Sequence, residues 1–265
     1  MSPSTSFTDR LLKRFLSKMW HRMILLQAAH PSILENPAAY WAAGLFGRSA
    51  TLRLTDGTRL QVRRDNLREV TNILLLSYYG ARFGGSRSVR HRWRLSTEEG
   101  VVETPSGIRF SLDSLEANIF AETFIYDLHR VETGLAGRVV VDVGGHVGDT
   151  ALYFAGEGAT VHSMEPDPLN FQRLQANIAL NPKLSGQIHP LKVAVGVDGM
   201  VSFHSGLLGG SGKFATIGEP IQVESISLTS FLDRNHIEHP YLLKLDCKGS
   251  EFEIVKDPAM ARFEQ

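Results

Sequence analysis

The spacing of apolar positions changes near residue 138 and divides the chain into two parts. From Val139 onward, short apolar runs alternate with helix-like segments, a pattern typical of a right-handed parallel α/β sheet. Before it, helix-like and strand-like patterns follow one another without such alternation. We therefore expect an N-terminal helical and β-hairpin extension at residues 1–137 and an α/β domain at residues 138–265.

The extension begins with an amphipathic pattern over Phe7 to Ala29, in which apolar residues recur every three or four positions and basic residues occupy others. A helix is expected there, ending at His30-Pro31 because the residue before proline disfavours the α conformation. Its expected use is packing on the main domain, and peripheral membrane contact is the alternative. The apolar run at Met23 to Leu26 is too short to span a bilayer.

The rest of the extension predicts a hairpin around Asp56-Gly57, followed by helices and short strands. Asn66 is expected to cap the helix that follows the hairpin. The predicted elements are a helix near 38–46, strands 51–55 and 59–63, a helix to Tyr79, strands 92–96, 100–103 and 108–111, and a helix from Ser114 to Arg130.

The second part predicts strands and helices in alternation, with one two-stranded insertion. The expected elements are a strand from Val139, a helix from Thr150 to Gly156, strand 160–165, helix 170–180, strand 188–195, insertion strands 200–204 and 221–226, helix 228–235 and strand 241–246.

A glycine-rich turn joins the first predicted strand of this part to its helix. Gly144, Gly145 and Gly148 permit backbone conformations closed to other residues and allow a ligand to approach the main chain. The helix after them would direct its unpaired N–H groups and positive dipole end at the turn. This arrangement predicts a site for a nucleotide-like ligand.

The spacing of this turn disfavours a nicotinamide dehydrogenase. In a G-x-G-x-x-G fingerprint that ends at Gly145 and Gly148, Val143 would occupy the first glycine position. Glu165 ends the next predicted strand, about twenty residues beyond the turn, where a carboxylate can accept hydrogen bonds from both ribose hydroxyls. We therefore predict ribose binding by Glu165.

A third signal lies in the last predicted strand, where Lys244 and Asp246 alternate onto the same face. A charged pair is costly in a buried strand unless each member has a partner or a task. Asp246, at the carboxyl end of that strand, would face the crevice in which open α/β sheets bind ligands.

These segments together resemble the FkbM-type family of class I S-adenosylmethionine-dependent methyltransferases. The resemblance covers roughly Val139 to Val255. It is carried by the turn Val141 to Thr150, by Met164-Glu165-Pro166-Asp167, by the helix residues Leu174, Asn177, Ile178, Leu180 and Asn181, and by Leu243 to Glu251.

The resemblance implies a Rossmann-like, mostly parallel α/β fold, S-adenosylmethionine as methyl donor, and a hydroxyl acceptor on a sugar, lipid or polyketide. Asp142, Gly144, Gly145 and Gly148 would form the cofactor turn, Glu165 would hold the ribose, and Asp149 would lie near the methionine end. The remaining residues that the resemblance places beside the cofactor are His146, Thr150, Pro166, Asp167 and Asp246.

The catalytic hypothesis starts from Asp246, which the resemblance places near the transferred methyl group. As a base, it would accept or orient the acceptor's proton, with Lys244 tuning its charge and Glu251 or His146 as the next candidates. The alternative is that Asp246 only binds the cofactor's amino group or anchors the following turn.

The chain departs from the family pattern at three places. Gly145-His146 replaces the commoner Ala-Asn of this turn, and Lys248 stands where many relatives carry Glu. The chain also ends soon after Asp246, so we expect a C-terminal truncation that removes the last strands and leaves the strand at Tyr241 as an apolar edge. A catalytically inactive, methyltransferase-like binding domain is therefore the main alternative to an enzyme.

Composition narrows the expected partners and location. The 28 basic and 28 acidic residues balance, which argues against nucleic acid as a partner. The N-terminal part is mildly basic, since residues 1–137 hold 18 of the basic and 13 of the acidic residues. A single cysteine, Cys247, excludes an internal disulfide and fits a cytoplasmic location. The histidines form no recognisable metal-ligand set, and we expect no metal.

Overall fold

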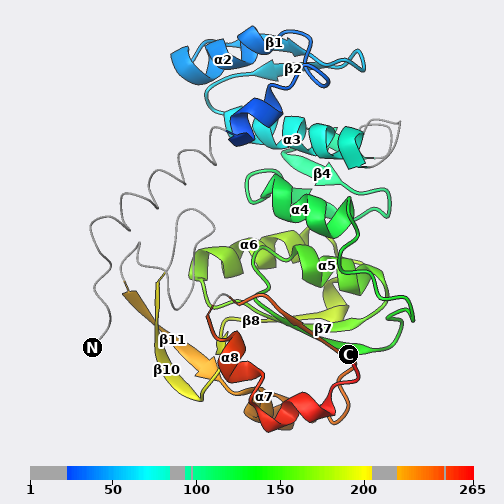
Figure 1. The fold of residues 1–265 in the computed structure, drawn as a ribbon, viewed down its shortest axis with the longest axis vertical. Coiled ribbons are helices and arrows are strands. Elements are labelled where there is room, and N and C mark those ends of the chain that lie inside the picture. Colours follow the sequence, from blue (N-terminus) through cyan, green and yellow to red (C-terminus); the bar gives the residue numbers. More distant parts are fainter. Residues whose placement is uncertain (1–22, 84–92, 97, 205–219, 248) are drawn as a thin grey trace. The chain divides into compact units, whose positions relative to one another are not determined.

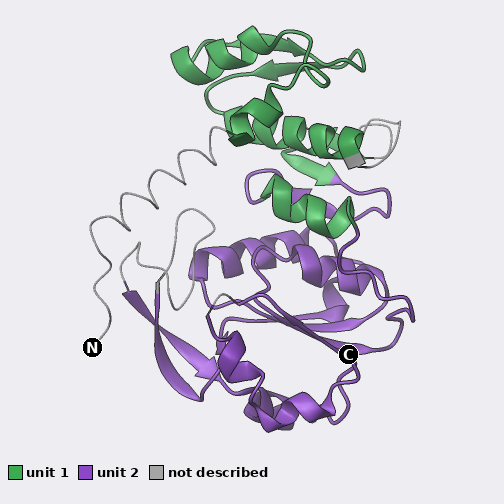
Figure 2. Ribbon diagram, in the orientation of Figure 1, with its two compact units in different colours: residues 1–102, 115–126 green, residues 103–114, 127–265 purple. Residues whose placement is uncertain are grey.

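The computed structural model describes residues 23–83, 93–96, 98–204, 220–247 and 249–265 (Figure 1). The chain forms two compact units, one of residues 1–102 and 115–126 and one of residues 103–114 and 127–265 (Figure 2). Most of the predicted helix at 7–29, and Lys248, lie outside the described residues. Residues 23–28 are helical and the helix ends before His30, as expected.

The first unit contains the predicted hairpin, with Leu52 opposite Leu60 and both side chains buried. Trp93 packs edge-on against Phe120 in the same unit. No described helix has the length and apolar character needed to cross a membrane. The elements of this unit are α2 (Pro37–Phe46), β1 (Ala50–Arg53), β2 (Arg59–Val62), α3 (Leu67–Phe83), β3 (Arg94–Ser96), most of β4 (Val101–Glu103) and α4 (Ala117–Phe124).

Two expectations for this region were wrong. The Asn66 side chain does not cap α3, because its oxygen accepts the Arg63 N–H and its amide donates to the Gln61 carbonyl oxygen. The helix predicted from Ser114 to Arg130 is reduced to α4, since the chain leaves the helix at Ile125 and Asp127 has a left-handed conformation with φ of 55°.

The second unit is built on a four-stranded parallel sheet in the order β12-β6-β7-β8. Figure 1 shows α5 and α6 on one face of this sheet and α7 and α8 on the other. The α/β fold class with a parallel sheet is thus confirmed. The sheet's elements and covering helices are β6 (Val139–Val143), α5 (Asp149–Gly156), β7 (Thr160–Met164), α6 (Pro168–Ala179), β8 (Ile188–Leu191), α7 (Leu228–Arg234) and β12 (Leu242–Leu245).

The strand predicted over residues 188–195 was wrong as a single element. It divides into β8, which pairs with β7, and β9 (Ala194–Val195), which pairs with β11 in a second sheet. The second sheet has the order β10-β11-β9, and the expected insertion hairpin forms its antiparallel pair. Its other strands are β10 (Gly199–His204) and β11 (Pro220–Ile226), and the unit also contains β5 (Arg109–Ser111).

An apolar core lies between the parallel sheet and α7. Val141, Val143 and Met164 from the strands pack there with Phe231 and Leu232 from the helix. The chain then forms the one-turn helix α8 (Glu251–Ile254) and two 3-10 helices, η2 (Ser185–Gln187) and η3 (Pro258–Arg262). β12 is the end strand among the described residues of this sheet, and Gln265 forms backbone hydrogen bonds with its Leu243 and with the preceding Tyr241.

Candidate functional site

The strand order creates a switch point between β6 and β12. From β6 the chain proceeds to β7 and β8 on one side, and β12 later joins β6 on the other. Ligands of open α/β sheets bind beyond the carboxyl ends of the strands at such a point. The glycine turn follows β6, Glu165 follows β7 and Asp246 follows β12. The structure therefore brings the three sequence signals to one edge of the sheet.

The glycines of the turn are required by the protein's own packing. Gly144 has a φ of 83°, and a Cβ built on it would lie 2.1 Å from the carbonyl oxygen of Asp246. A Cβ on Gly145 would lie 2.0 Å from Ser163 Oγ. Gly148, with a φ of 92°, precedes α5 as its N-cap. At the first two glycines, the close approach that was expected for a ligand is made by Ser163 of β7 and by Asp246 just after β12.

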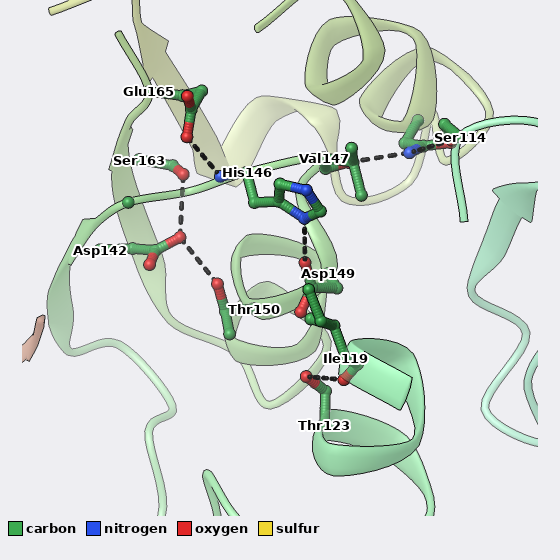
Figure 3. Close-up of polar contacts among 12 residues, drawn as sticks. Ser114, Ile119, Thr123, Asp142, His146, Val147, Asp149, Thr150, Ser163 and Glu165 are labelled. Carbon is green, nitrogen blue, oxygen red and sulfur yellow. Dashed lines mark hydrogen bonds and ion pairs between the residues drawn. The ribbon is translucent and has the colours of Figure 1, made fainter. Parts of the chain in front are cut away.

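Asp142 lies beneath this turn, and its carboxylate is completely buried. Lys244, opposite it on β12, places Nζ 2.9 Å from Asp142 Oδ1 and donates to the Gly144 carbonyl oxygen at 2.7 Å. Thr150 and Ser163 donate hydroxyl hydrogen bonds to Asp142 Oδ2 (Figure 3). The Lys244–Asp142 pair therefore ties β12 to both β6 and its turn.

The charge of Lys244 is maintained by this environment. Burial by itself would lower the pKa of its amine, but the carboxylates of Asp142, Asp149 and Asp246 outweigh burial and raise that pKa above its ordinary value. Lys244 is therefore a cation that fixes the turn, and its proton is held firmly.

Glu165 lies beside the turn with 5% of its surface exposed. Its Oε2 accepts the His146 N–H at 2.8 Å (Figure 3). Its Oε1 accepts the Asp167 N–H at 2.9 Å. Burial raises the pKa of the Glu165 carboxyl to about 7, although these two N–H groups act in the opposite direction. Each oxygen keeps acceptor capacity for a further donor.

The other residues expected at the cofactor occupy the same edge. Asp149 begins α5 and is buried, and its Oδ1 lies 3.9 Å from His146 Nδ1. Asp167 is the N-cap of α6, where its carboxylate accepts the N–H groups of Leu169 and Asn170. Pro166 lies between Glu165 and this cap. Asp167 thus orients α6 and, through its own N–H, Glu165.

The three residues expected to be catalytic differ in exposure. Asp246 is exposed just beyond β12, and its N–H donates to the Val143 carbonyl oxygen. Glu251 is half-buried at the start of α8 and accepts the Gly249 N–H at 2.6 Å. Lys244 is engaged with Asp142, as described above. Only Asp246 among the three presents an open carboxylate.

Cys247 does not suit a nucleophilic role. Burial, followed by the neighbouring Glu251 carboxylate, raises the pKa of its thiol to about 11, so the thiolate is scarce at neutral pH. Among the described residues, no group of three or more His, Cys, Asp or Glu side chains could hold a metal ion.

Two further polar residues support the turn, of which the sequence analysis missed Ser163 and named Asn177 only as part of the family resemblance. Ser163 contacts Asp142 from β7, and Asn177 on α6 donates to the Val147 carbonyl oxygen at 2.8 Å. Strand alternation places Ser163 on the same buried face as Val161, and this pattern alone would have identified Ser163 as a buried polar residue. The contact of Asn177 depends on the packing of α6, which residue spacing does not specify.

The residues present fit a nucleoside with a ribose. Glu165 is a buried carboxylate with spare acceptor capacity at the carboxyl end of the strand after the turn, the position at which α/β folds bind ribose hydroxyls. The N-terminus of α5 supplies further N–H groups at the same edge.

Comparison with known proteins finds similar methyltransferases. Residues 142–265 match the model of the Methyltransferase FkbM domain. The chain is similar to the hexuronic acid methyltransferase AglP of Haloferax volcanii, with 26% identity over 184 residues that cover 68% of this chain and 65% of the relative. It thus spans slightly less than two thirds of that relative's length.

A solved structure, methyltransferase FkbM from Methylobacillus flagellatus KT, shares 16% sequence identity with a TM-score of 0.35. That similarity covers 73% of this chain and 45% of the other. The match of residues 142–265 includes the glycine turn, Glu165 and the strand that carries Lys244. These residues lie in the segment 142–265 that matches the Methyltransferase FkbM domain, and this segment is similar to that family.

Proposed function

We propose that this protein transfers a methyl group from S-adenosylmethionine to a hydroxyl oxygen of a sugar-containing acceptor. The observation that carries the proposal is the buried carboxylate of Glu165 beside the glycine turn, at the switch point of a sheet within the family match. We assign residues 138–265 as the cofactor-binding domain, since every proposed site residue lies there.

Glu165 is the proposed ribose ligand. Its ionised carboxylate would accept hydrogen bonds from the two ribose hydroxyls while the His146 and Asp167 N–H groups hold it in place. The Lys244–Asp142 pair and Thr150 would keep the turn rigid, and Asp149 would face the methionine end. Rigid placement of such groups lowers the entropy cost of aligning reactants.

S-adenosylmethionine, when bound, supplies a methyl group activated by its sulfonium. We propose that the exposed Asp246 carboxylate accepts the proton of the acceptor hydroxyl and orients that oxygen. Lys244 is assigned a positioning role, because its hydrogen bond to Gly144 and its ion pair with Asp142 hold both strand ends. Glu251 orders the start of α8 through the Gly249 N–H.

The acceptor class is proposed from the relative. Its name, hexuronic acid methyltransferase, supports a sugar or a sugar linked to lipid as the acceptor. The proposed location is the cytoplasm, which the single cysteine supports, because cytosolic proteins rarely depend on disulfides.

Calorimetric titration tests the cofactor assignment. The protein should bind S-adenosylmethionine and give no response to NAD, and Glu165→Ala should weaken binding by at least about tenfold, since each lost hydrogen bond to a charged group contributes about 1.5–3 kcal/mol. Glu157→Ala at the other end of α5 is the matched control and should bind like the wild type. No binding by the wild type would favour an inactive domain.

Turnover tests the role of Asp246. With a uronic acid oligosaccharide as acceptor, Asp246→Asn should reduce kcat by about 10²–10⁴-fold, the range typical of a lost general base, and leave cofactor affinity unchanged. Unchanged turnover would remove Asp246 as the base, and a loss of cofactor affinity instead would assign it to cofactor binding.

A further inference from the structure

Asn177 is a completely buried amide whose side-chain hydrogen bonds reach three residues in two other segments of its unit. Its Nδ2 donates to the Val147 carbonyl oxygen at 2.8 Å and to Ser114 Oγ at 3.1 Å. Its Oδ1 accepts the Ser111 N–H at 3.0 Å. Figure 3 shows the Val147 and Ser114 ends of this connection. The side chain thus joins α6 to the glycine turn and to the segment after β5.

The turn that Asn177 contacts holds a residue in an unfavourable conformation. His146 has a φ of 49°, in the left-handed region that residues other than glycine seldom adopt. Such a conformation persists only where the surroundings determine it. On one side of His146, its N–H is held by Glu165, and on the other side the next residue's carbonyl is held by Asn177. The two contacts bracket the left-handed residue.

We propose that Asn177 is a positioning residue of the cofactor site, which fixes the His146 N–H and, through it, the Glu165 carboxylate. The inference rests on the proposed use of Glu165 for the ribose. Without the Asn177 contact, the Val147 carbonyl loses its buried partner and the turn can relax away from the left-handed conformation. Glu165 would then lose the donor that orients Oε2.

Asn181 provides a matched control within the same unit. It is also buried, and its Nδ2 donates to two backbone carbonyls, those of Arg109 and Asn177. Its Oδ1 accepts the Arg109 N–H at 2.8 Å. These are the same kinds of contact as those of Asn177, but none of them reaches residues 144–148. A purely structural role would make the two residues equivalent.

The experiment replaces each amide with a carboxylate, which keeps an acceptor oxygen and removes the two N–H donors. Both variants, Asn177→Asp and Asn181→Asp, are first shown to be folded by thermal melting. Titration with S-adenosylmethionine should then show at least about tenfold weaker binding for Asn177→Asp, the effect of one buried polar group left unpaired, and wild-type affinity for Asn181→Asp. The KM for the cofactor should rise in the same variant.

Amide hydrogen exchange without any ligand gives a second readout. The His146 and Gly148 N–H groups should exchange faster in Asn177→Asp and at the wild-type rate in Asn181→Asp. If Asn177→Asp does not fold, Ser114→Ala removes one partner of the same amide and should weaken binding in the same direction by a smaller factor.

Two results would overturn the inference. Wild-type cofactor affinity and wild-type exchange rates in Asn177→Asp would show that the turn keeps its conformation without the Asn177 contact. Equal losses of affinity in Asn177→Asp and Asn181→Asp would show a general loss of stability. If the wild-type protein does not bind S-adenosylmethionine, the proposed function fails, and the exchange measurement still decides whether Asn177 fixes the turn.

Discussion

The two compact units place their acidic side chains differently. In the described part of the first unit, Glu35, Asp65 and Glu99 form ion pairs at the surface, as in Arg53–Glu35, where the two side chains are 58% and 51% exposed. The second unit contains four buried carboxylates within a short stretch of chain. They are Asp142, Asp149, Glu165 and Asp167.

This difference shows in which unit carboxylates are buried despite the free-energy cost of removing a charge from water. An exposed ion pair contributes about 0–1 kcal/mol, whereas a buried charge is strongly unfavourable without a partner. Each of the four buried carboxylates has such a partner, such as Lys244 for Asp142 and backbone N–H groups for Glu165. All four lie at the edge of the sheet where we propose that the cofactor binds, so the buried carboxylates coincide with the proposed site.

Removing the cation of the buried pair should have the largest effect. Lys244→Met keeps the aliphatic stem but leaves Asp142 buried without its counter-ion, and should lower the free energy of unfolding by about 3–5 kcal/mol. Arg53→Met, the matched change at the surface pair, should lower it by less than about 1 kcal/mol. Urea denaturation measures both values.

A second variant separates charge from shape in this prediction. Asp142→Asn combined with Lys244→Met removes both charges and should recover part of the lost stability. If the double variant is as unstable as Lys244→Met alone, the cost arises from packing, and the contrast between the units is not electrostatic.

The pH dependence of cofactor binding is the next largest effect. As the proposed ribose ligand, Glu165 would accept the hydroxyls in its ionised form, and burial raises its pKa to about 7, so protonation below pH 7 should oppose binding. Affinity for S-adenosylmethionine should therefore rise about tenfold between pH 6 and pH 8. Glu165→Gln cannot ionise at this position, so its affinity for S-adenosylmethionine should not show this rise between pH 6 and pH 8. Equal pH profiles for both proteins would exclude Glu165 as the source of the pH dependence.

The smallest expected effect concerns a half-buried imidazole in the second unit. His162 stacks on His189 with ring centroids 4.8 Å apart, and burial followed by this neighbour lowers its pKa to about 4. Because the folded protein binds this proton less tightly than the unfolded chain, its stability is full above pH 6.5 and is lost as the pH falls towards 4.

His162→Phe should remove that loss. Since solvent reaches the imidazole and screens its charge, the gain relative to wild type should be about 1 kcal/mol at pH 4.5 and absent at pH 7.5. Thermal melts at the two pH values measure it. A constant difference between the proteins would show a packing effect in place of titration.

The sequence predicted the parts of the fold that local patterns determine. Three consecutive valines and the glycines after them specified β6 and its turn, and Asp56-Gly57 specified the β1–β2 hairpin. The parallel sheet was predicted, but its strand order was not, since right-handed crossovers limit the possible topologies without selecting the one that forms the switch point. The roles of Glu165 and Asp246 stay predictions until ligand binding is measured.

Features that depend on tertiary packing were not accessible. The apolar run at 188–195 gives no signal for the change of sheet after Leu191, whose carbonyl oxygen accepts the Glu165 N–H. The Asn66 amide had partners in the preceding strand that compete with helix capping. The contact of Asn177 with the turn likewise requires α6 to be in place.

The contact between Gly145 and Ser163 has an evolutionary consequence. A methyl group at position 145, as in the commoner Ala of this turn, would collide with Ser163 Oγ at 2.0 Å but would lie 3.4 Å from Ser163 Cβ. Alanine at 145 therefore requires the Ser163 hydroxyl either to rotate away or to be lost, and both changes remove its hydrogen bond to Asp142. The residues at positions 145 and 163 are thus coupled through a buried carboxylate that neither of them carries.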